Sequence, residues 1–132
     1  MENQVNRGKL MIASFLTLVA AGMGFAARGA AGPAWAKMGI GPGEFGGIMG
    51  AGFLGFGFVI LAGGILVEMF GYKKLLLLAI ILHFVSAGML FVAPGMYDGW
   101  VESDSANATA NVQNLLYWSV FLFSICAGLY EA

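Results

Sequence analysis

The chain has 132 residues, of which 60% are hydrophobic and 10% are charged, and its formal net charge is −1. A soluble domain carries about 25% charged residues, so this composition excludes an ordinary soluble globular protein. The charge balance leaves no basic surface for nucleic acid, and a single cysteine excludes a disulfide framework. Glycine is frequent, at 21 residues, and lies within apolar runs, which is typical of helices that pack in a lipid bilayer.

Four apolar segments are long enough, or nearly so, for helices that cross a bilayer, which takes about 20 residues. We expect membrane-spanning helices over residues 10–31, 45–67, 74–93 and 114–132. This predicts an all-α, polytopic membrane protein with a short loop at 68–73 and a longer loop at 94–113. A cleaved signal peptide within residues 1–30 is the competing interpretation, but its apolar run exceeds the usual length of about 7–15 residues.

The distribution of basic residues predicts an orientation. Four basic residues fall on one side of the predicted membrane and two on the other: Arg7, Lys9, Lys73 and Lys74 against Arg28 and Lys37. Segments rich in Lys and Arg stay in the cytoplasm. We therefore expect a bacterial inner-membrane protein whose N-terminus and 68–73 loop are cytoplasmic and whose 94–113 loop is extracytoplasmic.

The segment between the second and third apolar runs, residues 64–76, reads Gly-Ile-Leu-Val-Glu-Met-Phe-Gly-Tyr-Lys-Lys-Leu-Leu. The small residue Gly64 would let a neighbouring backbone approach. Glu68 follows one turn later on the same helix face, and Gly71 would supply a tight turn. A simpler interpretation is a glycine-rich helix end, an interfacial turn and two cytoplasmic lysines.

This segment resembles the loop between helices 2 and 3 of the major facilitator superfamily, whose pattern is G-x-L-x-D-x-x-G-x-[RK]-[RK]. The matching residues are Gly64, Leu66, Gly71, Lys73 and Lys74, with Glu68 in place of the usual Asp and Met69 in place of the usual Arg. The resemblance implies that the chain supplies the first four helices of a twelve-helix fold. It also implies that Glu68 joins a charge network between the two halves of the transporter and leaves it when the conformation changes.

Three ionisable residues within the apolar runs are candidate substrate or proton sites, because such residues are costly at membrane depth. Arg28 either extends its guanidinium group to the outer membrane surface or faces a central cavity, where it would bind an anionic or polyhydroxylated solute. His83 lies near mid-membrane and either forms an interhelical hydrogen bond or relays protons.

The third candidate is Glu131, which follows Ala127-Gly128-Leu129-Tyr130. This context resembles the fourth helix of the fucose:proton symporter branch of the superfamily, in which such a carboxylate is a proton and substrate site. The alternative is that Glu131 marks the cytoplasmic end of its helix.

The remaining polar and aromatic residues need no functional explanation at this stage. We expect Ser86 to bond to carbonyl groups of its own helix and Cys126 to be a buried thiol. Aromatic residues near the predicted outer surface, including Trp35 and Trp100, fit an aromatic belt.

The sequence contains no nucleotide-binding loop, metal-ligand cluster or Ser/His/Asp arrangement. We therefore expect no enzyme, cofactor or metal. The favoured function is secondary active transport of a small polar solute, a sugar or related metabolite, by alternating access. A proton, or otherwise sodium, would be the coupling ion. Such a transporter needs further C-terminal helices, so we expect the chain to be a fragment. Two alternatives stay open: a complete four-helix exporter that acts as a dimer, and a membrane scaffold subunit that does not transport.

Overall fold

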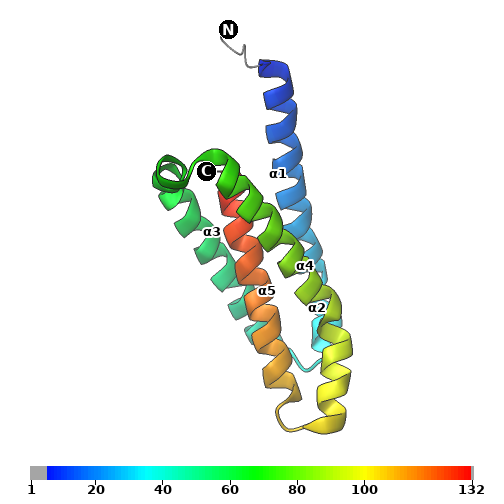
Figure 1. Ribbon diagram of the computed structural model, residues 1–132. Coiled ribbons are helices and arrows are strands. Elements are labelled where there is room, and N and C mark those ends of the chain that lie inside the picture. The colour runs from blue at the N-terminus through cyan, green and yellow to red at the C-terminus, as the bar shows by residue number, and fades with distance from the viewer. Residues whose placement is uncertain (1–5, 132) are drawn as a thin grey trace.

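The computed structural model describes residues 6–131 as a bundle of helices joined by short connections (Figure 1). The helices are α1 (Arg7–Ala30), α2 (Gly32–Ala36), α3 (Pro42–Phe70), α4 (Tyr72–Ser103) and α5 (Ala108–Glu131). Four spans are long and apolar enough to cross a membrane, with α1 and α2 together forming the first. The prediction of an all-α chain with four apolar helices of membrane-spanning length is confirmed.

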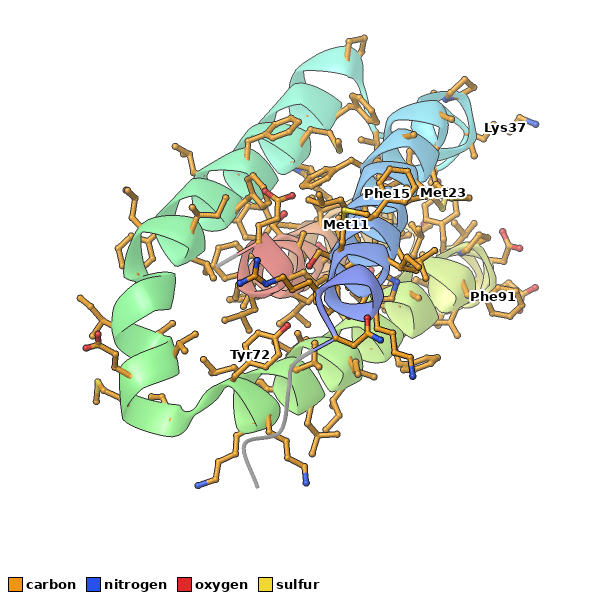
Figure 2. The ribbon with its side chains drawn as sticks, turned by 90° about the horizontal axis from the view of Figure 1, so that it is seen from above. Met11, Phe15, Met23, Lys37, Tyr72 and Phe91 are labelled. Carbon is orange, nitrogen blue, oxygen red and sulfur yellow. The ribbon has the colours of Figure 1, made fainter. Side chains whose placement is uncertain are left out.

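Helix α5 lies at the centre of the bundle. It packs against α4 and α3 and, less extensively, against α1. Seen from above, α1, α3 and α4 surround α5, and the exposed side chain of Phe91 points outward from α4 (Figure 2). The start of α1, the α3–α4 turn and the end of α5 lie at one end of the bundle, called here the Gly71 end (Figure 1). Helix α2 and the α4–α5 connection lie at the other, the α2 end.

The core follows one face of α5. Its large, fully buried side chains are Val112, Leu116, Val120 and Phe123, and their spacing of four, four and three residues is that of a single helix face. At the α2 end, Trp35 packs into the same core and is 2% exposed. The aromatic-belt interpretation of Trp35 is therefore wrong, because its ring fills the core instead of facing a membrane surface.

Helices α3 and α5 approach each other closely at glycines. A Cβ atom at Gly52 of α3 would lie 2.6 Å from Val120 Cγ1, and one at Gly128 of α5 would lie 2.8 Å from Val59 Cβ. Both distances are too short for real atoms, so this helix contact requires glycine on each side. A Cβ atom at Gly50, two residues before Gly52, would meet nothing within 4 Å.

The predicted bounds of the loop at 94–113 are wrong. Helix α4 continues through Pro94 to Ser103, and α5 begins at Ala108. Proline removes one backbone donor and crowds the preceding turn. However, Tyr97 and Trp100 on the next two turns pack against the core, and this packing keeps α4 helical.

The predicted loop at 68–73 reduces to a single residue. Helix α3 ends at Phe70 and α4 begins at Tyr72, and the Gly71 between them has a φ of 80°. Only glycine adopts this backbone conformation without a steric penalty. The charged residues on either side, Glu68 and Lys73, belong to the last turn of α3 and the first turn of α4.

The glycine contact between α3 and α5 predicts a difference between two neighbouring substitutions. Gly52→Ala should destabilise the protein by about 1–3 kcal/mol, the usual range for overpacking a tight interior. Gly50→Ala is the matched control, and it should be neutral or stabilising by up to about 1 kcal/mol because alanine favours the helix. Thermal unfolding of the purified protein in detergent, followed by tryptophan fluorescence, measures both. Equal effects would contradict the close approach.

Candidate functional site

The buried polar groups of the bundle gather where α1, α4 and α5 meet. Arg28 of α1 is only 4% exposed. Its Nη2 group donates a hydrogen bond of 2.6 Å to Ser86 Oγ, and its Nη1 group donates one of 3.1 Å to the carbonyl oxygen of Gly24. The guanidinium carbon lies 3.7 Å from the centroid of the Phe123 ring, a cation–π arrangement. Arg28 therefore points into the bundle and not toward a membrane surface.

Two serines join α4 to α5 beneath this guanidinium group. Ser86 Oγ donates to the carbonyl oxygen of Ser119 at 2.7 Å, and Ser119 Oγ donates to the carbonyl oxygen of Ser86 at 2.9 Å. Both serines are fully buried. The expectation that Ser86 bonds within its own helix is wrong, since its hydroxyl group links all three helices in one network.

The positive charge of Arg28 has no acidic partner among residues 6–131, where its hydrogen bonds go to Ser86 and Gly24. Its Nε atom is buried without a hydrogen-bond partner in the same part of the chain. A buried charge without an opposite charge beside it usually destabilises a protein. Within the described chain, a hydroxyl group, a carbonyl group and an aromatic face are what stabilise this cation.

His83 also contacts the Phe123 ring. Its Nδ1 atom is 3.6 Å from Cys126 Sγ, and its ring meets the Phe123 ring at 64° with the centroids 5.6 Å apart. The Cys126 thiol donates to the carbonyl oxygen of Phe123 at 2.9 Å. His83 therefore makes an interhelical polar contact, one of the two roles expected for it, and Phe123 links it to Arg28.

A cavity of about 410 Å³ lies beside His83 between α1, α4 and α5. Its polar lining residues come from three helices: Thr17, His83 and Tyr130. The remaining lining is apolar, contributed by residues such as Leu16 and Phe84. Leu16 and Phe84 are themselves exposed, so this cavity is open at the surface of the bundle.

Glu131, the third candidate, stands apart from this cluster. It is exposed in the last turn of α5 at the Gly71 end. The structure thus brings Arg28 and His83 together around Phe123 and leaves Glu131 outside. The predicted role of Glu131 in proton or substrate binding stays a prediction.

The residues of the loop motif surround the Gly71 turn. Five are exposed, namely Gly64, Glu68, Gly71, Lys73 and Lys74, and Leu66 is half-buried. A Cβ atom at Gly64 would meet nothing within 4 Å, so no described helix approaches it. The close contact expected at Gly64 is absent from this part of the chain.

Sequence reasoning missed three residues of the buried site: Gly24, Ser119 and Phe123. A Cβ atom at Gly24 would overlap the Phe123 ring, so glycine is needed there for the ring to lie under Arg28. The available signal was the presence of two hydroxyl residues, Ser86 and Ser119, in otherwise apolar helices, where such groups often bond across helices.

The comparisons with known proteins identify no relative. No protein-family model, no curated protein and no solved structure matches this chain. The similarity of the Gly71 turn to a transporter loop therefore rests on the motif residues alone.

The network around Arg28 predicts non-additive effects on stability. Ser86→Ala should destabilise the protein by about 1–3 kcal/mol, because it leaves a guanidinium donor buried without its acceptor and removes the bond to the Ser119 carbonyl oxygen. Arg28→Met should be neutral or stabilising, because it removes the buried charge. In the double variant, Ser86→Ala should destabilise the protein less than it does when Arg28 is present.

Thermal unfolding of the four proteins forms a double-mutant cycle. Ser14→Ala serves as the control, since Ser14 lies in α1 and is exposed. If Ser86→Ala lowers the thermal stability by the same amount with and without Arg28, the two side chains are not energetically coupled.

Proposed function

We propose that this chain forms the first four helices of a secondary active transporter of the major facilitator type. It would move a small polar solute, a sugar or related metabolite, by alternating access and couple that movement to a proton. Further helices of the same protein would complete the solute site, which in such transporters lies near the bilayer midplane.

The observation that carries this proposal is the geometry of the Gly71 turn. A single glycine at a φ of 80° separates two helices of 29 and 32 residues. Glu68 is exposed one turn before this glycine, and Lys73 and Lys74 are exposed directly after it. An exposed acid and two exposed cations at a rigid turn can form ion pairs with another part of the protein and release them.

The buried Arg28 supports a functional role for the helix cluster. An ionisable residue inside apolar helices is costly and marks a functional site by default. Arg28 of α1 and His83 of α4 both contact the Phe123 ring, and His83 also lines the cavity described above. We propose that this cluster couples movement of α1 to that of α4 and α5, and that Glu131 takes up the proton.

The charges at the two ends support an inner-membrane orientation with the Gly71 end in the cytoplasm. Arg7, Lys9, Lys73 and Lys74 lie at the Gly71 end. The Gly71 end also carries the acids Glu68 and Glu131, whereas Lys37 is the exposed basic residue of the α2 end, beside the acids Glu44, Asp98, Glu102 and Asp104. This asymmetry follows the rule that cytoplasmic segments are the basic ones.

Substitution of Glu68 in the complete gene tests the transport proposal. Glu68→Ala should lower proton-driven uptake of a panel of radiolabelled monosaccharides by about tenfold, which corresponds to about 1.4 kcal/mol between two conformations. Glu68→Asp, which restores the acid usual in the motif, should retain uptake. Glu44→Ala is the matched control, because Glu44 lies on the same helix at its opposite end.

Equal uptake by wild type, Glu68→Ala and Glu44→Ala would contradict a gating role for Glu68. A protein that takes up none of the sugars and whose conformation is indifferent to Glu68→Ala would fit a membrane scaffold.

The fold proposal has its own test in the gene. Sequencing the DNA downstream of the Ala132 codon should reveal an open frame with about eight more apolar segments, each of about 20 residues. An Asn-Pro pair should follow soon after Glu131 if the resemblance to the fourth helix of the fucose:proton symporter branch holds. A stop codon directly after Ala132 would overturn the twelve-helix proposal, and cross-linking would then test the four-helix exporter dimer.

A further inference from the structure

A second hollow in the bundle has a different character from the cavity beside His83. Helices α3, α4 and α5 form a groove of about 260 Å³ near the Gly71 end. Its walls include Leu66 and Phe70 of α3, Leu78 of α4 and Leu129 of α5. Lys74 is the charged residue among those that line the groove.

The residues that line the groove on α3 are spread over about the depth of one lipid leaflet. Its lining on α3 extends from Val59 to Phe70, which is about 17 Å at a rise of about 1.5 Å per residue. The hydrocarbon core of a bilayer is about 30 Å thick. If Lys74 lies at the headgroup level, the groove reaches the middle of the bilayer, which is the depth of one acyl chain.

The charge at the mouth of the groove is positive. Lys74 is exposed in the first turn of α4, next to Lys73. The acids of this end among residues 6–131 are Glu68 and Glu131, which are exposed and do not line the groove. Basic residues beside an apolar helix end attract the anionic lipids of the cytoplasmic leaflet.

We propose that this groove binds an anionic phospholipid, with part of one acyl chain between α3, α4 and α5 and the headgroup phosphate on the Lys74 ammonium group. The apolar walls of the groove match the acyl chain, and the lysine at its mouth matches the negatively charged phosphate. Lys74 also belongs to the motif on which the proposed function rests, but lipid binding requires only that the helices lie in a membrane.

Native mass spectrometry of the full-length protein, purified in detergent, tests this site directly. The protein is exposed to palmitoyl-oleoyl phosphatidylglycerol and to the matching phosphatidylcholine, and the retained lipid is counted. The wild type should retain phosphatidylglycerol in preference. Lys74→Gln should lower that preference about fivefold, the factor expected for one lysine near an anionic surface. Lys74→Arg should preserve it.

Two variants separate the groove from general surface charge. Lys73→Gln removes the neighbouring lysine, which does not line the groove, and should have a much smaller effect than Lys74→Gln. Leu129→Trp fills the groove with Lys74 intact and should reduce retention of both lipids. Gel filtration verifies that each variant stays folded and monodisperse.

Three results would overturn the proposal. An equal loss in Lys73→Gln and Lys74→Gln would indicate attraction to the whole basic end. Retention unchanged by Leu129→Trp would place the lipid elsewhere. No retained phosphatidylglycerol in the wild type would mean that another helix or a second copy of the chain covers the groove. Each readout is a binding measurement, so the result is independent of whether the protein transports a solute.

Discussion

The close approach of α3 and α5 sets the geometry of the bundle. In an apolar environment helices gain little from burying more apolar surface, so their association depends on close packing and on polar contacts between them. Glycine at Gly52 and Gly128 lets the two backbones come together. With α5 held against α3, its opposite faces are presented to α4 and α1, and the buried hydroxyl network forms there. The site therefore depends on residues that carry no functional group.

The buried network places an unfavourable charge in the bundle but also fixes the position of α1. Arg28 brings a positive charge into an apolar interior, where its partners are Ser86, the carbonyl oxygen of Gly24 and the face of Phe123. The same contacts fix the rotation of α1 about its axis relative to α4 and α5. Arg28 is expected to lower the stability of the bundle, yet it positions α1. Such a residue suits a protein whose helices change their arrangement better than one whose helices stay fixed.

The sequence located the four long helices because their apolar runs are uninterrupted and a membrane-spanning segment must satisfy its backbone internally. It did not locate their ends. A proline such as Pro94 ends a helix when nothing beyond it packs, but here Tyr97 packs against the core and α4 continues. For the site, Arg28 stood out as an ionisable residue in an apolar run. Its connection to Ser119 through Ser86 was not predictable, because these residues come together only after three helices have packed. Periodicity along one helix cannot identify the residue that a partner helix will contact.

Helix α1 is attached to the bundle mainly through its second half. From Met11 to Ala20 every residue except Thr17 is exposed, whereas Ala21 and Arg28 are buried. If α1 tilts relative to the bundle, the buried region around Arg28 is the point about which it would turn. The arm from Arg28 to Arg7 is about 32 Å long, so a tilt of about 10° displaces the far end by about 5 Å. Such a tilt would move the far end of α1 by about the rise of one helical turn.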